Sequence, residues 1–387
     1  MISIGLGHEG VNLMRVRSFP FWVVYFFLLF NASCAQRESG VTKTKEIPVR
    51  EEVSVSADPY RATGDAPGDY RAQSLSGDYR QNKAVDQFID RLVTQYGFSR
   101  EYLLGLFSQA KRKQWTLDYL AKEKPTGSPK PGAWTRYRAQ FLDDRHISSG
   151  VRFWSMHASA LKRAYDEYGV SPEYILGILG VETIYGSNLG NHRIIDALTT
   201  LSFDYPRRAD YFRSELEKFL VMCRGEGVDP SKPKGSYAGA MGLGQFMPSS
   251  FLEYAVDFNG DGKKNLWDPE DAIGSVAHYF SGYGWQREAR VTLPVKVLGS
   301  SIGLKTGYDT SYSPEELEMA GIGLSGSLKT AETGSMSLLR LSSTRGDEYW
   351  VGFKNFYVIS RYNHSTHYSM AVHQLAQAIR KAYMGLE

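Results

Sequence analysis

One carboxyl group occupies a position where helical periodicity calls for an apolar residue. In the stretch 171–190, SPEYILGILGVETIYGSNLG, one predicted helix face carries Ile175, Ile178 and Leu179. The next position on that face is Glu182. Burial raises a carboxyl pKa because it disfavours the charged form, and a carboxyl protonated near neutral pH can act as a general acid. The stretch alone leaves open a buried glutamate paired with a base, or a helix end facing solvent.

A glycine-rich stretch, GSYAGAMGLGQFMPSS at 235–250, is a second place where chemistry can be expected. Glycine permits close backbone approach and unusual turns. Ser236, Gln245 and Phe246 stand among the glycines and can hydrogen-bond to a substrate or stack on it. The GxxxxGK[ST] pattern is absent, so the stretch is not a phosphate-binding loop of that type.

Two arginines open the next long predicted helix, which runs from Arg207 to about Arg224. Positive charges at the positive end of a helix dipole are locally unfavourable. Such a conflict between local rules is typical of functional sites. The simpler interpretation is that Arg207 and Arg208 pair with Asp204 or Asp210.

The segment DFNGDGKKNLWD, residues 257–268, has the spacing of a single calcium-binding loop. Its expected ligands, in loop order, are Asp257, Asn259, Asp261, the carbonyl of Lys263, Asn265 and Asp268. Gly262 stands where such a loop turns sharply, and the loop ends in aspartate where glutamate is usual. A single loop favours a structural ion over a calcium sensor, and turns stabilised without metal are the alternative.

Other chemistries find little support in the sequence. His364 and His367 lack a third ligand at zinc-protease spacing, and neither HExxH nor GxSxG occurs. The net charge of +3 gives no strong field for nucleic acid. The only cysteines are Cys34 and Cys223, so no internal disulfide forms if Cys34 is used otherwise.

The N-terminus has the features of a secretory signal. Two arginines precede an apolar run at 19–30, which is shorter than the roughly 20 residues that a membrane-spanning helix needs. Small residues then lead to Cys34, as in the lipobox of bacterial lipoproteins, although Asn31 replaces the usual leucine. Ordinary cleavage and an uncleaved anchor are the alternatives. Met14 would make a more typical start than Met1.

The periodicity of the remaining chain predicts a mainly α (α+β) protein with several parts. They are a signal at 1–34, a disordered tether at 35–82 that contains the GDYR repeat, a helical domain at 83–150, a catalytic core with the cation loop at 151–288, a small antiparallel β subdomain at 289–353, and a C-terminal segment at 354–387 that completes the groove and the helical domain.

Five motifs in this order resemble the membrane-bound lytic murein transglycosylase B family. They are GVETIYG, FDYPRRADYF, GSYAGAMGLGQFMPSS, DFNGDGKKNLWDPEDAIGSVAHYF and FYVISRYNHSTHY. The resemblance covers about 85–385 and implies a lysozyme-like helical core with one EF-hand-type loop, a flanking helical domain and a small β domain. It also implies cleavage of the β-1,4 bond between N-acetylmuramic acid and N-acetylglucosamine in peptidoglycan, with 1,6-anhydromuramoyl products and Glu182 as the sole acid and base.

The resemblance further implies the residues around the substrate and the ion. The substrate-binding set is Ser236, Gln245, Phe246, Tyr137, Arg207, Arg208, Tyr211, Tyr279, Tyr362 and Tyr368, and the cation set is Asp257, Asn259, Asp261, Lys263 and Asp268. We expect a structural Ca²⁺, with Na⁺ as an alternative, and no organic cofactor. The expected partners are glycan strands, the membrane through a lipid on Cys34, and other wall-synthesis or wall-degrading proteins. The expected location is the periplasm, at the outer membrane. A hydrolysing muramidase and a non-catalytic, calcium-stapled wall-binding protein are the rival functions.

Overall fold

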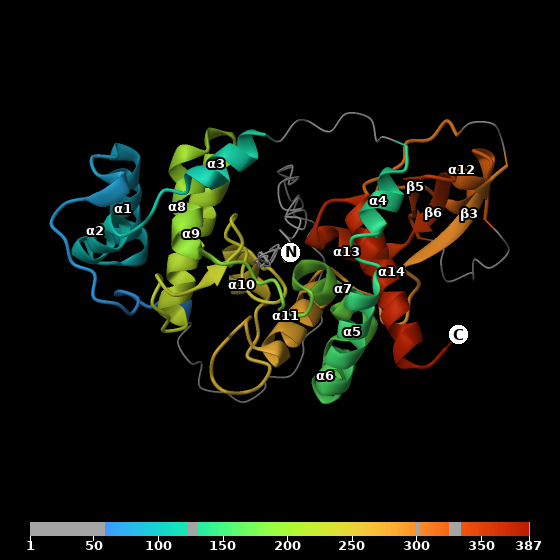
Figure 1. The fold of residues 1–387 in the computed structure, drawn as a ribbon, viewed down its shortest axis with the longest axis horizontal. Coiled ribbons are helices and arrows are strands. Elements are labelled where there is room, and N and C mark those ends of the chain that lie inside the picture. Colours follow the sequence, from blue (N-terminus) through green and yellow to red (C-terminus); the bar gives the residue numbers. More distant parts are fainter. Residues whose placement is uncertain (1–58, 123–130, 299–301, 325–333, 387) are drawn as a thin grey trace, which may run out of the picture.

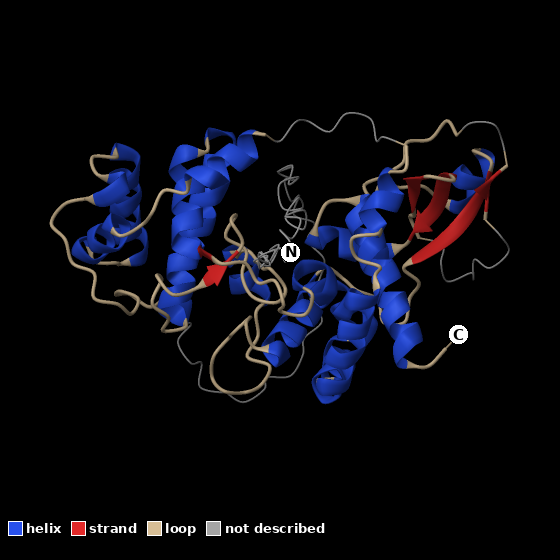
Figure 2. Cartoon of the chain, viewed as in Figure 1, coloured by secondary structure: helices blue, strands red, loops and turns tan. Residues whose placement is uncertain are grey.

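The computed structural model of the chain describes residues 59–122, 131–298, 302–324 and 334–386. It is an elongated arrangement of helices with a small sheet at one end, where the chain from β3 onward lies (Figure 1). Helices dominate the rest, and long loops connect them (Figure 2). The predicted mainly helical α+β class is therefore correct.

The helices and strands have the following bounds. The α-helices are α1 Lys83–Tyr96, α2 Arg100–Ser108, α3 Gln114–Ala121, α4 Ala133–Arg138, α5 Asp144–Met156, α6 Ala158–Tyr168, α7 Pro172–Thr183, α8 Ile194–Asp204, α9 Ala209–Gly225, α10 Pro248–Tyr254, α11 Pro269–Gly282, α12 Pro314–Met319, α13 Lys354–Tyr362 and α14 Thr366–Tyr383. The strands are β1 His192–Arg193, β2 Lys234–Gly235, β3 Thr292–Val297, β4 Ile322–Gly323, β5 Ser337–Ser343 and β6 Gly346–Gly352. Short 3₁₀ turns are η1 Pro59–Arg61, η2 Gly77–Tyr79 and η3 Pro206–Arg208.

Helix α7 lies at the centre of the molecule and contacts α5, α6, α11 and α14 (Figure 1). Ser171 takes the extended N-cap conformation and Pro172 occupies the first turn, where its missing N–H costs nothing. Ile184 ends the helix in the left-handed conformation with φ 51°. The predicted helix is confirmed, and it ends at Thr183. Its apolar row is buried, so the last turn of α7 lies inside the fold.

A second helical group forms around the pair α8 and α9, which pack closely together. Helix α3 contacts α8, while α1 and α2 pack beside each other at the far end of the group (Figure 1). The side chain of Asn82 caps α1 by accepting hydrogen bonds from two backbone N–H groups of its first turn. The aromatic ring of Phe88, in α1, meets Phe203, in α8, edge to face at 5.6 Å between centroids.

The β subdomain is a four-stranded antiparallel sheet in the order β4-β3-β6-β5. In the central strand β6, Val351 lies opposite Leu293 of β3 and Leu338 of β5. One sheet face covers a small separate core that includes Leu317 of α12 and Phe353. The predicted β subdomain at 289–353 is therefore present, and α12 supplies its only helix among the described residues.

The predicted boundary between a helical domain at 83–150 and a core at 151–288 is wrong. Helix α5 runs from Asp144 to Met156 and crosses it without a break. Helices α4 and α5 contact α14, whereas α3 packs on α8. The chain therefore leaves the group around α8 and α9, and returns to it after α7. Helical periodicity reports faces along a helix, and it does not report which helices share a core.

The predicted disordered tether at 35–82 is wrong for its last part, residues 59–82. Tyr70 and Tyr79, the tyrosines of the two GDYR copies, are 6% and 2% exposed. The hydroxyl of Tyr70 donates to Asp229 Oδ1 at 2.6 Å. The repeat thus supplies two aromatic anchors to the second helical group. Its charged and glycine residues lower the average hydropathy and hide these anchors from a compositional argument.

The predicted signal, Cys34 and the first part of the tether lie outside the described residues. Within the described residues, no helix has both the length and the apolar character that crossing a membrane requires. Cys223 is a free, buried thiol in α9.

Candidate active site

Glu182 lies in the last turn of α7, partly buried, on the same face as Ile175, Ile178 and Leu179. Tyr368 Oη donates a hydrogen bond to Glu182 Oε1 at 2.5 Å. Burial raises the pKa of Glu182 to about 8, and the hydrogen bond from Tyr368 opposes this rise. The carboxyl is therefore protonated near neutral pH. No basic group compensates it, so the alternative of a buried ion pair is excluded for the described residues.

Three tyrosines lie near this carboxyl, and all three belong to the substrate-binding set that the family resemblance implied. Burial, and then the Glu182 charge, raise the pKa of Tyr137, Tyr362 and Tyr368 well above the ordinary value. They come from α4, which precedes α7 in the chain, and from α13 and α14, which lie far beyond it. Neutral phenols next to Glu182 provide hydroxyl groups without adding a charge.

The Thr183 hydroxyl joins the end of α7 to the glycine-rich stretch. It donates to the carbonyl oxygen of Leu243 at 2.9 Å and accepts the backbone N–H of Gly186 at 3.0 Å. The hydroxyl of Tyr362 donates to the carbonyl oxygen of the next residue, Gly244. A Cβ atom at Gly244 would lie only 2.8 Å from that hydroxyl oxygen. Glycine is needed here because the tyrosine approaches the backbone.

Ser236 and Gln245 shape the glycine-rich stretch from within. Ser236 Oγ accepts the backbone N–H groups of Ala240 at 2.9 Å and of Ala238 at 3.3 Å. Gln245 Nε2 donates to the carbonyl oxygens of Gly242 at 3.0 Å and Leu189 at 3.3 Å. The predicted role of Ser236 in binding the substrate stays a prediction. The serine hydroxyl hydrogen and the Gln245 carbonyl oxygen remain the groups that could meet a substrate.

Phe246 and Tyr279 lie behind the site surface. Phe246 is 2% exposed, and its ring contacts Tyr279 at 5.7 Å and Tyr362 at 5.9 Å between centroids. Tyr279 Oη donates to the carbonyl oxygen of Arg361 at 2.7 Å. These two side chains therefore support Tyr362, and their predicted contact with substrate stays a prediction. Motif position alone does not distinguish a lining residue from the residue beneath it.

The arginine pair belongs to the other helical group. Arg207 is exposed in η3, and the Arg208 guanidinium lies 4.4 Å from the Tyr211 ring centroid. The simpler interpretation, in which they pair with Asp204 or Asp210, finds no support, because Asp204 pairs with Arg112 at 3.0 Å and Asp210 pairs with Arg213. Neither Arg207 nor Arg208 reaches Glu182 through a hydrogen bond or ion pair in the described residues. Their predicted substrate contacts stay a prediction.

The loop at 257–268 is closed by its own backbone. Asp257 accepts N–H groups of Gly260, Asp261 and Gly262 at 2.8, 3.1 and 2.8 Å. Asp268 caps α11 through Oδ1. The side chain of Asn259 accepts the N–H of Asp261, and the side chain of Asp261 accepts the N–H of Lys263. Within the described residues, no cluster of three His, Cys, Asp or Glu side chains is placed to hold a metal. The oxygen ligands of the loop are those that a hard cation such as Ca²⁺ prefers. In this structure, the same side chains form successive Asx turns with the loop backbone.

Buried Asp271 holds this loop to α11, and the sequence argument missed it. Its Oδ1 accepts the N–H groups of Phe258 and Asn259 at 2.7 and 3.0 Å, and its Oδ2 accepts that of Asn265 at 2.8 Å. Asp271 is the third residue of α11. Acidic residues are common in the first turn of a helix, so its sequence position alone does not indicate this role. Thr183 was missed as well, because a threonine beside a glutamate carries no signal of its own.

A family model for the transglycosylase SLT domain matches residues 80–377. The chain belongs to the transglycosylase SLT domain family. The match includes Glu182, its tyrosines, the glycine-rich stretch and the loop at 257–268. The family assignment confirms the resemblance that the five sequence motifs indicated.

Relatives of this transglycosylase SLT domain protein share most of its length. The membrane-bound lytic murein transglycosylase B of Escherichia coli K12 is 50% identical over 318 residues, which are 81% of this chain and 87% of that protein. The E. coli lytic transglycosylase SLT35 in complex with calcium is 49% identical, with a TM-score of 0.75 over 80% of this chain and 97% of that one. SltB3 of Pseudomonas aeruginosa, in complex with NAG-anhNAM-pentapeptide, is 27% identical, with a TM-score of 0.67 over 80% of both chains.

Proposed function

We propose that this chain is a lytic transglycosylase that acts on peptidoglycan, with Glu182 as its only catalytic carboxyl. The observation that carries the proposal is the protonated carboxyl at the end of α7, hydrogen-bonded by Tyr368 and held at a pKa of about 8. Most glycosidases use two carboxyl groups on opposite sides of the bond. No second acid contributes to the pKa of Glu182, which favours a mechanism with one carboxyl.

In the first step, Glu182 donates its proton to the oxygen between N-acetylmuramic acid and N-acetylglucosamine. The bond from C1 to that oxygen breaks, and positive charge develops at C1. The N-acetyl group of the same sugar stabilises that charge in place of a second carboxylate. Tyr368 keeps its hydrogen bond to Oε1 and so stabilises the carboxylate that Glu182 becomes.

In the second step, the Glu182 carboxylate removes the proton from the 6-hydroxyl of the muramoyl sugar. The 6-oxygen attacks C1 and closes a 1,6-anhydro ring. Glu182 ends protonated, as it began, and no water is consumed. Because the nucleophile is attached to the sugar, its approach costs little translational entropy. The tyrosines packed around Glu182 limit the room for a competing water.

Two rival functions make different products. A hydrolysing muramidase would use the same glutamate and add one water to each cleaved bond. A wall-binding protein would bind strands and cleave none. The membership of the transglycosylase SLT domain family favours the anhydro product over both.

Product mass and one substitution test the proposal. Glu182→Gln should keep the fold, and near neutral pH its melting temperature should be no lower than that of the unmodified protein, because the amide stays neutral without binding a proton. It should release no anhydromuropeptides from purified sacculi. Products one water heavier from the unmodified protein would favour the muramidase. Anhydro products from the Glu182→Gln variant would exclude Glu182 as the sole acid.

We further propose that the loop at 257–268 binds a structural Ca²⁺, with Na⁺ as the alternative occupant. The related SLT35 was solved with calcium. The side-chain oxygens of Asp257, Asn259 and Asp261, with the carbonyl oxygen of Lys263, would face the ion, and Asp268 would contribute its Oδ2. Gly262, with φ 88°, provides the sharp turn that such a loop requires.

The location is also a proposal. The related E. coli protein is membrane-bound by name. A lipid on Cys34 would hold this chain at the outer membrane, in the periplasm, where its glycan substrate lies. Cys34→Ser should release the protein from the membrane fraction, and unchanged fractionation would contradict lipidation. Partners among other wall-synthesis or wall-degrading proteins remain a prediction.

A further inference from the structure

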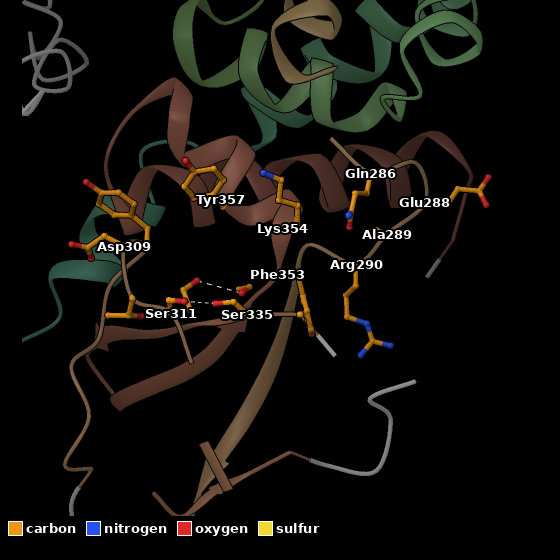
Figure 3. Close-up of a pocket in the computed structure, with 15 residues that line it drawn as sticks. Gln286, Glu288, Ala289, Arg290, Asp309, Ser311, Ser335, Phe353, Lys354 and Tyr357 are labelled. Atoms are coloured by element: carbon orange, nitrogen blue, oxygen red, sulfur yellow. Dashed lines mark hydrogen bonds between the residues drawn. The ribbon is translucent and has the colours of Figure 1, made fainter. Parts of the chain in front are cut away.

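A cavity of about 720 Å³ lies between α13 and the β subdomain (Figure 3), and its lining does not include the three tyrosines near Glu182. Lys354 and Tyr357 stand side by side on its helical wall, and Ser311 and Ser335 lie on the facing wall (Figure 3). The mechanism proposed above uses none of these side chains.

The exposed face of α13 carries alternating cationic and aromatic groups. Lys354, Tyr357 and Arg361 are spaced three and four residues apart, so they share one side of the helix. Lys354 Nζ lies 4.7 Å from the Tyr357 ring centroid, and Arg361 Cζ lies 5.7 Å from it. On its other side, Arg361 Cζ lies 5.6 Å from the Tyr283 ring centroid. The aromatic rings hold both cations in place.

Both cations lack an acidic partner in the described part of the chain. Neither Lys354 nor Arg361 forms an ion pair there, and the buried Nε of Arg361 has no hydrogen-bond acceptor. Two acids stand at the cavity edge. Glu288 already accepts the hydroxyl of Tyr165 at 2.5 Å, which leaves Asp309 as the unengaged carboxylate. The cavity is thus lined by the cations Lys354 and Arg290 and the carboxylate Asp309, and Arg361 lies next to its wall, beside the Tyr357 ring.

This surface continues into the active site. Tyr362, which lies next to the Glu182 charge, directly follows Arg361 in α13. From Tyr362 back to Lys354 the helix spans about 12 Å, at 1.5 Å per residue. Tyr308 lines the cavity, and its backbone N–H donates to Thr366 Oγ1 at 3.1 Å, in the turn before Tyr368. A peptide of five residues extends to about 17 Å, which is long enough to start at the sugar and reach Lys354.

We propose that this cavity binds the peptide stem carried by the muramoyl sugar. Its carboxylates meet Lys354 and Arg361, and a free amine of the stem meets Asp309. Charge-assisted bonds of this kind favour strands that carry stems over bare strands. The proposal rests on the proposed action on peptidoglycan, and it adds a determinant of substrate choice outside the bond-breaking residues.

Paired substrates test the proposal. Glycan strands with intact stems are compared with the same strands after an amidase has removed the stems. For Lys354→Glu we expect kcat/KM on stem-bearing strands to fall about tenfold, or about 1.4 kcal/mol, and on bare strands to change less than about twofold. Lys354→Arg should restore the rate on stem-bearing strands. Lys381→Glu, an exposed lysine of α14, is the matched control and should alter neither rate.

A binding measurement separates this proposal from the catalytic one. With Glu182→Gln as background, calorimetry gives the affinity for both kinds of oligosaccharide without cleavage. Added Lys354→Glu should weaken binding of stem-bearing oligosaccharides alone, by about tenfold. Equal affinity for both oligosaccharides, or equal losses on both, would overturn the stem site even if cleavage is confirmed. Loss of cleavage in the unmodified protein, with stem-dependent binding intact, would overturn the catalytic proposal only.

Discussion

The hydroxyl of Thr183 donates to the carbonyl oxygen of Leu243 at 2.9 Å and thereby fixes the glycine-rich stretch against the end of α7. Its donor, Thr183, directly follows Glu182. Its acceptor, the Leu243 carbonyl, is adjacent in the chain to the Gly244 carbonyl, which accepts the hydroxyl of Tyr362. This single hydrogen bond therefore positions Glu182 and the glycine-rich stretch relative to each other.

Thr183→Val should remove this connection while keeping the side-chain shape. It leaves the Leu243 carbonyl and the Gly186 N–H without their partner, which costs about 1–3 kcal/mol of unfolding free energy. In the folded protein, we expect kcat to fall by a larger factor than the affinity for substrate. Thr94→Val is the control, since its exposed hydroxyl bonds only within α1, to the Asp90 carbonyl. Equal effects of the two variants on kcat would contradict a positioning role.

The pH dependence of stability should report on Glu182. Its folded pKa of about 8 lies above the ordinary 4.5, so the folded protein binds more protons than the unfolded one between these values. The free energy of unfolding contributed by this group therefore falls as pH rises from about 4.5 to about 8. Glu182→Gln removes that fall and should gain stability over the unmodified protein toward pH 8. Parallel melting curves across this range would argue against the raised pKa.

Removing the Tyr368 hydroxyl should move the same titration. The hydrogen bond from Tyr368 lowers the pKa of Glu182, so Tyr368→Phe should raise it. The acid form then persists to higher pH, and the falling alkaline limb of kcat/KM shifts upward. The pH–rate profile of the two proteins measures this shift. A limb that stays in place, or moves down, would mean that another group controls it.

Gly180 is required because Tyr185 folds back onto α7. A Cβ atom at Gly180 would lie 2.5 Å from Tyr185 Oη. Gly180→Ala should therefore lower the unfolding free energy by about 1–3 kcal/mol, as overpacked cores do. Gly303→Ala is the control, because its Cβ would meet nothing within 4 Å. Adding Tyr185→Phe should recover part of the loss in Gly180→Ala, and no recovery would place the clash elsewhere.

Calcium should act on melting temperature through the loop at 257–268. Asp257→Ala removes a carboxylate from the proposed cation set and should abolish the rise in melting temperature that calcium gives. Asp69→Ala, in an exposed carboxylate outside the loop, should keep that rise. A rise retained in Asp257→Ala would place the ion elsewhere, and no rise in the unmodified protein would contradict a structural Ca²⁺.

The sequence was most informative where the evidence is local. The helix from Pro172 to Thr183, the apolar face that includes Glu182, and the β subdomain all follow from periodicity and turn residues. The family resemblance also implied Tyr137, Tyr362 and Tyr368 as substrate-binding residues, and all three lie near Glu182. Local periodicity predicts which face of a helix or strand is buried. The family resemblance then indicates which distant residues lie near that face.

What the sequence could not supply depends on distant contacts. The packing of Tyr70 against Asp229 orders a segment whose composition looks disordered. The path of the chain through α5 joins two predicted domains because α4 and α5 pack on α14. The burial of Phe246 places a motif residue beneath the site. Each of these depends on which surfaces meet, and one-dimensional spacing does not record that.

The hydrogen bond between Glu182 and Tyr368 has a consequence for how the enzyme is made. The two residues are 186 positions apart, and Tyr368 belongs to the last helix of the chain. A ribosome must therefore finish nearly the whole protein before the acid gains its hydrogen-bond partner. Nascent chains and fragments broken before α14 lack that partner, so their Glu182 has no tyrosine hydroxyl to stabilise its carboxylate form.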